Sequence, residues 1–326
     1  MNIPVFDAHC DTICQVNGRG LSLRENNLHT DLRRGLAYTP YAQVFAIFDR
    51  PWGEMKSGEP LGYTTDWPEN RLTALCGEIL DRLLSEFEKN ADILTLCRDM
   101  AQANQAAEKG KIAAFIAVEG AELLGCDPER LKAAYNRGVR LVNLSWNYDN
   151  ALCGAANGVN KGGLTEKGRE FVGIMQEMGV AVDLSHASER TFWDTAEIAK
   201  RPIMAGHSNS KKICNHPRNL TDAQFSEIVR QKGVAGLNLC PEFLSESKSA
   251  DIEDVIRHGE HFLELGGEKA LCLGGDLDGI ESLPKGMTGI ESYGEIYEAM
   301  LKRNYKESLI QDIFYNNLFS ALERML

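Results

Sequence analysis

Eight short apolar runs alternate with longer helical patterns along the chain, and this alternation limits the fold more than any other feature. Each run is nearly continuous in Val, Ile, Leu, Ala or Phe, which is typical of parallel strands covered on both faces. The eight predicted strands cover residues 3–9, 42–48, 112–119, 139–146, 180–186, 202–207, 234–239 and 270–276.

Stretches with helical periodicity lie between and after these runs. Thr165, Ser188 and Thr221 stand where helix N-caps are expected. Eight strands in alternation with helices predict a (β/α)8 TIM-type barrel. A doubly wound open sheet is the alternative, and strand count and chain length favour the barrel. The predicted helices cover residues 69–107 with a break near Asn90, then 128–137, 165–178, 188–200, 221–231, 252–265, 293–303 and 306–325.

The chain has no linker rich in Pro, Gly or Ser, no internal repeat and no low-complexity segment. We therefore expect a single domain over residues 1–326. Residues 49–68 contain three Pro and three Gly, and we expect a long loop there after the second strand.

Charge and composition exclude several classes of partner. A net charge of −12 argues against nucleic acid or an anionic membrane surface. No apolar stretch is long enough for a membrane span, and the N-terminus lacks the basic start of a secretory signal. The nine cysteines form no C-x-x-C pair, which favours reduced core residues and a cytoplasmic location. A homodimer is the default expectation for a soluble enzyme.

Ionisable residues stand at the ends of several predicted strands. The first strand runs into His9 and Asp11, the third ends at Glu119, the fifth at His186 and the sixth at His207. Because the C-terminal ends of barrel strands open onto one face, these residues converge from distant parts of the chain. A core strand gains nothing from such an end, since a buried charge without a partner is costly.

This set of side chains is typical of a two-metal hydrolase site. His9 and Asp11 leave the strand on the same side and can hold one ion, while Cys10 between them points the other way. Glu119 has two carboxylate oxygens and can bridge two ions about 3.5–4 Å apart. A water bound between two such ions loses its proton near neutral pH and becomes a nucleophile. Imidazoles and carboxylates without thiolate favour zinc, with manganese or cobalt as alternatives.

Some other titratable residues are expected to be structural. Asp7 precedes the proposed ligands and is expected to orient a neighbour or cap a turn. The remaining histidines lie in predicted loops or on a predicted helix, where a hydrogen-bonded structural role is commonest. They are His29, His216, His258 and His261.

Six short segments stand out in order along the chain, from residue 6 to residue 279: FDAHCDT, AVEGAE, VDLSH, AGHSNS, RNLTD and LGGDLDG. Together they resemble the membrane dipeptidase family (renal dipeptidase-like, the M19 metallopeptidases of the amidohydrolase superfamily). The resemblance implies a hydrolase that cleaves dipeptides, often with a D-residue at the C-terminal position, and binds two zinc ions per chain. By position, His9 and Asp11 would bind one zinc, His186 and His207 the other, and Glu119 would bridge them.

The resemblance also implies two residues that act on the substrate. Arg218, in RNLTD, matches the residue that holds the substrate's free carboxylate, a task that suits a planar guanidinium. Asp276, at the end of the last strand, matches the carboxylate that takes a proton from the attacking water and gives it to the leaving amine. Asp278 is the competing candidate, and the strand-end position favours Asp276.

One position departs from the family pattern. The family commonly has a His in a Thr-His-Asn setting at the end of the fourth strand, where it helps to polarise the scissile carbonyl. Trp146 stands at this place, and its indole N–H can donate one hydrogen bond but cannot carry a proton. Either Trp146 or a neighbour, Asn147 or Tyr148, contacts the substrate, or the substrate class has shifted.

Three functions remain open on the sequence alone. The leading one is a cytoplasmic two-zinc dipeptidase whose partner is a small dipeptide. The second is a hydrolase of another amide or ester, such as an N-acyl amino acid, on the same metal site. The third is a metal-binding protein without turnover. Arg218 and Asp276 argue against the third, because neither is needed to bind metal.

Overall fold

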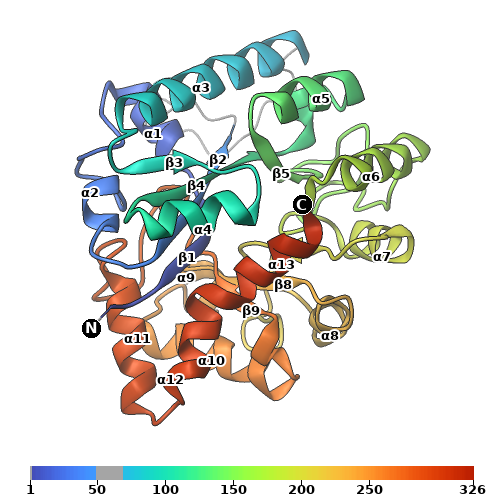
Figure 1. Ribbon diagram of the computed structural model, residues 1–326. Coiled ribbons are helices and arrows are strands. Elements are labelled where there is room, and N and C mark those ends of the chain that lie inside the picture. The colour runs from blue at the N-terminus through green and yellow to red at the C-terminus, as the bar shows by residue number, and fades with distance from the viewer. Residues whose placement is uncertain (1, 49–68) are drawn as a thin grey trace.

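Nine parallel strands form one sheet, and eight of them close into a barrel, which confirms the predicted (β/α)8 fold (Figure 1). The computed structural model describes residues 2–48 and 69–326, so the loop predicted at residues 49–68 lies outside the described residues. The ring closes where β2 pairs with β4 and β9 pairs with β1. The strands are β1 (Val5–Cys10), β2 (Tyr41–Ile47), β3 (Leu94–Leu96), β4 (Ile112–Glu119), β5 (Val139–Asn143), β6 (Ala181–Asp183), β7 (Met204–Ala205), β8 (Val234–Leu237) and β9 (Leu271–Leu273).

Strand β3 lies outside this ring and was not predicted. Its residues pair with the first part of β4, from Leu94 against Ile112 to Leu96 against Ala114. It separates α3 (Glu69–Lys89) from α4 (Met100–Glu108), within the stretch predicted to be helical. Three residues are too few to show a period-two pattern. The break predicted near Asn90 is confirmed.

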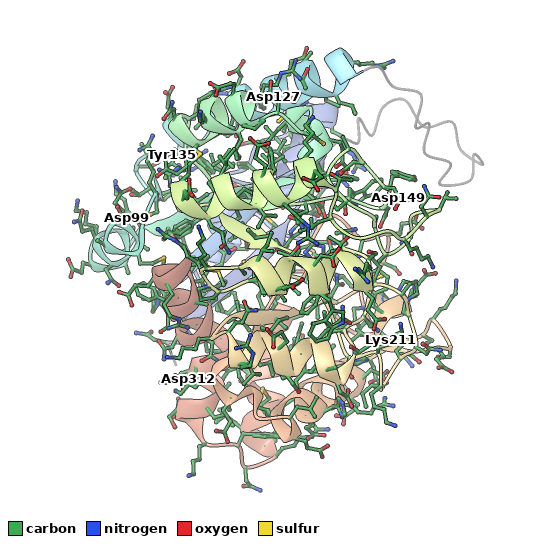
Figure 2. The ribbon with its side chains drawn as sticks, turned by 90° about the vertical axis from the view of Figure 1, so that its right-hand side faces the viewer. Asp99, Asp127, Tyr135, Asp149, Lys211 and Asp312 are labelled. Atoms are coloured by element: carbon green, nitrogen blue, oxygen red, sulfur yellow. The ribbon has the colours of Figure 1, made fainter. Side chains whose placement is uncertain are left out.

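Helices surround the barrel on its outside (Figure 1). The N-caps predicted at Thr165, Ser188 and Thr221 are confirmed, because each side chain accepts a backbone N–H three residues later. Asp99 and Asp127 also cap helices of this outer layer (Figure 2). The other helical elements are α1 (Thr12–Arg19), α2 (Leu32–Gly35), η1 (Ala121–Leu124), α5 (Pro128–Asn136), α6 (Glu166–Met178), α7 (Glu189–Ile198), α8 (Asp222–Arg230), α9 (Pro241–Leu244), α10 (Ile252–Glu264), η2 (Gly267–Lys269), α11 (Ser292–Lys302), α12 (Glu307–Gln311), the π-helix η3 (Asp312–Asn316) and α13 (Asn317–Met325).

Alternate strand residues fill the inside of the barrel. Ala113, Phe115 and Ala117 of β4 belong to this inner core, whereas their neighbours in β4 pack in the outer core under the helices. Helix α13 packs on the N-terminal part of the inner core and lies across the barrel in Figure 1. Glu119 continues the inward-facing series, so the alternation brings it to the opposite, C-terminal end.

The loops that follow the eight barrel strands lie together on one side of the molecule, whereas the loop after β3 lies on the other. Figure 2 shows Asp149, after β5, and Lys211, after β7, on this side, with Asp99 and Asp312 on the other.

All nine cysteines are free, and all except the half-buried Cys240 are buried. Within the described residues, we find no helix that is long and apolar enough to span a lipid bilayer.

Candidate active site

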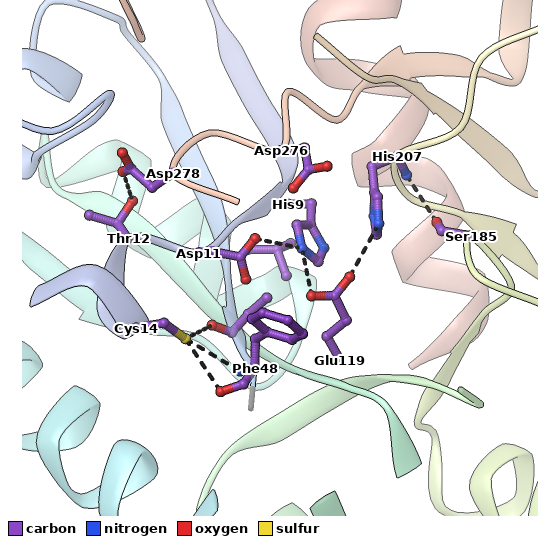
Figure 3. Close-up of polar contacts among 12 residues, drawn as sticks. His9, Asp11, Thr12, Cys14, Phe48, Glu119, Ser185, His207, Asp276 and Asp278 are labelled. Carbon is purple, nitrogen blue, oxygen red and sulfur yellow. Dashed lines mark hydrogen bonds and ion pairs between the residues drawn. The ribbon is translucent and has the colours of Figure 1, made fainter. Parts of the chain in front are cut away.

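The five predicted metal ligands come together at the C-terminal ends of the strands, and Figure 3 shows four of them. His9 lies in β1, Asp11 directly follows this strand, and Glu119 is the last residue of β4. His186 and His207 lie in the turns just after β6 and β7. None of the five is more than 5% exposed. The structure therefore forms one buried cluster from positions that are nearly two hundred residues apart in sequence.

Glu119 stands between two halves of this cluster. Its Oε2 lies 3.5 Å from Nε2 of His9, which in turn lies 3.4 Å from Oδ2 of Asp11. Its Oε1 lies 2.8 Å from Nε2 of His186 and 3.3 Å from Nε2 of His207. The carboxylate therefore directs one oxygen to each half, as a bridging ligand must.

Burial and mutual charge shift the pKa values of the cluster. Burial by itself would lower the pKa of His9, but Glu119 and Asp11 beside its ring hold it well above the ordinary value. Burial and the charge of Glu119 raise the pKa of Asp11 to about 8. Burial and the nearby Arg218 lower the pKa of His186 to about 3. A neutral imidazole offers the lone pair that metal ions bind.

The contacts of His186 fit a divalent cation. Nη2 of Arg218 lies 2.9 Å from Nε2 of His186. A guanidinium only donates hydrogen bonds, so this Nε2 is an acceptor with a lone pair. Its contact with Oε1 of Glu119, 2.8 Å away, joins two acceptors. A metal ion that binds both atoms would make this contact favourable, and it would replace Arg218 at the single lone pair of this nitrogen.

The other half of the cluster fits a cation as well. Nε2 of His9 is buried, makes no hydrogen bond with the described residues and faces the carboxylates of Asp11 and Glu119. Ligand atoms of His9, Glu119 and His207 lie within 4.8 Å of one another, as do those of His9, Asp11 and Asp276. A buried imidazole among carboxylates is a typical donor set for zinc and related ions.

Asp276 faces this cluster. Its backbone N–H donates to the carbonyl of His9 at 3.2 Å, which ties the turn after β9 to β1. Burial and the charge of Glu119 raise the pKa of Asp276 to about 6. A carboxylate with a raised pKa, close to the proposed ligands, is suited to proton transfer near neutral pH.

Asp278 is engaged elsewhere, although it lies only two residues away. Its Oδ2 accepts a hydrogen bond from Oγ1 of Thr12 at 2.6 Å, and its Oδ1 accepts the backbone N–H of His29 at 2.7 Å. Figure 3 shows Asp278 turned towards Thr12, while Asp276 lies above His9. Asp278 therefore joins α1 to the loop around His29.

Arg218 is a buried cation that borders a cavity. Arg218 is only 3% exposed, and its Nη1 makes no hydrogen bond with the described residues. The guanidinium carbon lies 5.5 Å from the ring centre of Phe243. The cavity has a volume of about 360 Å³ and is also bordered by Asp11, Glu119, His186 and Asp276. A negative group in this cavity would give Arg218 its missing acceptor.

Of the three residues predicted to contact substrate, two border this cavity, and Tyr148 is not among its lining residues. Trp146 and Asn147 border it directly. The Trp146 ring packs against Phe48 with ring centres 4.5 Å apart and against Tyr148 at 5.6 Å. Oδ1 of Asn147 lies 2.9 Å from Nδ1 of His186. Trp146 therefore forms an aromatic wall, while Asn147 contacts a proposed ligand.

Two buried carboxylates behind the site join neighbouring strands. Oδ1 of Asp7 accepts the backbone N–H groups of His9 at 3.3 Å and Gly275 at 2.9 Å. Asp183 makes equivalent contacts with the backbone after β6 and β7. A β-bulge in β1 between Asp7 and Cys10 also lies here, and bulges re-aim side chains beside active sites. The contacts of Asp7 agree with the expectation that it orients a neighbour.

Asn238 is a site residue that the sequence analysis missed. It is fully buried, and its Nδ2 donates to Oδ2 of Asp276 at 2.9 Å and to the carbonyl of His207 at 3.3 Å. The predicted strand continued to residue 239, so Asn238 did not count as a strand end. Strand β8 stops at Leu237, because the side chain of Asn209 then bonds both the N–H and the carbonyl of Asn238.

All four histidines that were not expected to be ligands make other contacts, including His216, whose Nδ1 accepts the backbone N–H of Arg218 at 3.2 Å. His29 accepts the N–H of Asp278, His258 accepts the N–H of Ser210, and His261 faces Asp222. The fourth, His216, borders the cavity and packs against Phe243 with ring centres 4.5 Å apart.

The sequence matches the family described as membrane dipeptidase (peptidase family M19) over residues 1–325. The chain belongs to this family. As a member of the M19 peptidases, it is a metallodipeptidase-type hydrolase. A metal cofactor is indicated by the family and by the cluster of His9, Glu119 and His207.

Two known proteins are similar to this chain over most of its length. A protein encoded in the PQQ-III 3′ region of Acinetobacter calcoaceticus is 30% identical over 292 residues, which is 81% of this chain and 90% of the relative. An uncharacterized dipeptidase of Schizosaccharomyces pombe is 31% identical over 64% of this chain and 52% of its own length.

Two solved structures of metallopeptidases share the whole fold. A metallo peptidase of Rhodobacter sphaeroides, crystallised with a phosphinate mimic of the dipeptide L-Ala-D-Ala, superposes with a TM-score of 0.88 at 25% identity and covers 100% of both chains. The M19 dipeptidase AC has a TM-score of 0.86 at 26% identity and covers 100% of this chain and 99% of its own.

Proposed function

We propose that the protein is a zinc-dependent dipeptidase that binds two zinc ions per chain and hydrolyses the peptide bond of dipeptides. His9 and Asp11 would hold one ion, His186 and His207 the other, and Glu119 would bridge them. When bound, such ions supply Lewis acidity, which lowers the pKa of water and polarises a carbonyl. The division of the Glu119 oxygens between the two halves of the cluster supports this assignment.

The observation that carries the proposal is the buried Arg218 beside the ligand cluster. Nη1 has no hydrogen-bond partner among the described residues, and the guanidinium borders the same cavity as Glu119 and Asp276. A buried donor without an acceptor is costly, so the site favours a substrate that brings a carboxylate. A dipeptide carries its free carboxylate close to the scissile bond.

The charge on the other side of the cavity supports an α-amine in the substrate. Asp11 and Glu119 would serve the metal ions and could not also attract an ammonium group. Asp276 and Glu281 border the same cavity outside the proposed ligand set, as does the cationic Arg218. This arrangement favours a zwitterionic substrate with an ammonium group near the carboxylates. The related Rhodobacter sphaeroides enzyme was solved with a mimic of L-Ala-D-Ala, which supports dipeptides, including those with a C-terminal D-residue.

The roles of the chain's own groups follow from this placement. Arg218 would hold the substrate carboxylate and so fix the scissile bond beside the cluster. Asp276 would accept a proton from the attacking water and give it to the leaving amine. Trp146 would contact the substrate as an aromatic wall and exclude water, with Tyr148 packed against it.

A substrate panel tests this function. Zinc-reconstituted protein is expected to hydrolyse L-Ala-L-Ala and L-Ala-D-Ala. N-acetyl-L-Ala lacks the amine, and we expect its kcat/KM to be at least about 100-fold lower than that of the dipeptides. Turnover of the N-acetyl compound at the rate of the dipeptides would favour the N-acyl amino acid hydrolase. No turnover of any compound, with metal bound, would favour a non-catalytic protein.

The metal stoichiometry is a separate prediction. Elemental analysis of zinc-reconstituted protein after dialysis is expected to give about two ions per chain. His9→Ala should chiefly remove one ion, because His9 contacts one half of the cluster. Glu119→Gln should weaken both, because an amide has only one oxygen and cannot bridge. One ion or none in the wild type would contradict the two-metal site.

A further inference from the structure

Asn147 lies against the proposed ligand His186 on the side away from Glu119. Its Oδ1 is 2.9 Å from Nδ1 of His186 and accepts a second hydrogen bond from Nδ2 of Asn157 at 3.2 Å. The loop that carries Asn157 is also tied to the ligand's backbone, because the N–H of Ala156 donates to the carbonyl of His186 at 2.8 Å. One loop therefore contacts both the ring and the main chain of His186.

The contacts of His186 with Arg218 and Asn147 favour one tautomer. Arg218 donates to Nε2, so this nitrogen carries no proton in the neutral ring. The single N–H is then on Nδ1, where the oxygen of Asn147 accepts it. The hydrogen bond from Nδ2 of Asn157 is consistent with an oxygen at this position of the Asn147 amide.

We infer that Asn147 is a positioning residue that holds His186 in the Nδ1–H tautomer and directs its Nε2 lone pair to the metal site. The inference rests on the proposed two-metal function and replaces the expectation that Asn147 contacts substrate. A hydrogen bond to the second ring nitrogen fixes the orientation of a ligand imidazole and raises its basicity. Asn147 would therefore set the affinity of one metal ion.

The neighbouring ligand His207 provides a contrast within the same site. Its Nδ1 is buried and makes no hydrogen bond with the described residues. Its backbone N–H donates to Oγ of Ser185 at 3.1 Å, so it is held through the main chain (Figure 3). Of the two imidazoles that face Oε1 of Glu119, His186 is the one whose Nδ1 contacts a side chain, as far as the described residues show.

Zinc affinity in matched variants tests the inference. Asn147→Leu keeps the size of the side chain and removes the acceptor, whereas Asn147→Asp keeps the acceptor. Competition with a chromophoric chelator is expected to show one of the two ions bound about 10- to 100-fold more weakly in Asn147→Leu, with the other ion unchanged. Asn147→Asp should bind both ions at least as tightly as the wild type. Asn157→Ala, which removes only the outer hydrogen bond, should stay within about twofold.

Nitrogen-15 NMR of histidine-labelled, metal-free protein gives a readout that does not depend on turnover. His186 is expected to be the Nδ1–H tautomer in the wild type and in Asn147→Asp, and a mixture of tautomers in Asn147→Leu. Unchanged affinity for both ions in Asn147→Leu, with only KM raised, would overturn the inference in favour of a substrate contact. A wild type that binds zinc but hydrolyses no dipeptide would overturn the proposed function and leave the positioning role standing. A wild type that binds no zinc would overturn both.

Discussion

Replacing Asp276 by Asn is expected to lower kcat by roughly 10²- to 10⁴-fold while zinc content stays close to that of the wild type. The amide has the same shape and can still accept the hydrogen bond from Asn238. It cannot take a proton from water, which is the step that the proposal assigns to Asp276. Steady-state kinetics with the best dipeptide, paired with elemental analysis of the same samples, would measure both quantities.

Asp278→Asn is the matched control, because it makes the same chemical change two residues away. Both oxygens of Asp278 accept hydrogen bonds, from Thr12 and from the backbone of His29. An amide keeps one acceptor oxygen, for the N–H of His29, and its NH2 group must find the Thr12 hydroxyl as an acceptor. We therefore expect a loss of at most about 1–3 kcal/mol in the free energy of unfolding and kcat within a few-fold of the wild type. If Asp278→Asn loses turnover and Asp276→Asn keeps it, the proton carrier is Asp278.

The fold was predictable from sequence because the barrel strands are fully buried and therefore nearly continuous in apolar residues. The positions at which the strands end were predicted less accurately. The predicted strand at residues 180–186 shortens to β6 (Ala181–Asp183), since the Asp183 side chain accepts the N–H of Ser185 and turns the chain away from its neighbour. From the sequence alone, an Asp in a hydrophobic run does not show whether the following backbone N–H bonds to the neighbouring strand or to the Asp side chain.

The convergence of the predicted ligands was predictable for a related reason. Parallel strands end on one face, so strand position alone brings His9, Glu119 and His207 together. The contacts around them were not predictable in this way. Asn147 meets His186 because the loop after β5 folds back onto the turn after β6, and the pairing of two loops leaves no periodic trace in sequence.

Arg218→Ala is expected to cost roughly 30- to 3,000-fold in kcat/KM on a dipeptide. The physical reason is the loss of a buried, charge-assisted pair, worth on the order of 2–5 kcal/mol when one partner is truncated. Arg218→Lys should recover only part of the loss, because an ammonium cannot make the planar double contact. Zinc content should be retained in both variants, since Arg218 is not among the proposed ligands.

A four-way comparison separates carboxylate recognition from a general effect on the site. Wild type and Arg218→Ala are each assayed with the free dipeptide and with its C-terminal amide. The amide should reduce wild-type kcat/KM about as much as the substitution does, and combining the two should add little, because each removes the same interaction. Arg218 also donates to His186, so a change in the metal site would lower the rate on both substrates equally. Independent penalties that multiply would mean that the carboxylate is bound elsewhere, and a general amide hydrolase would then explain the site better than a dipeptidase.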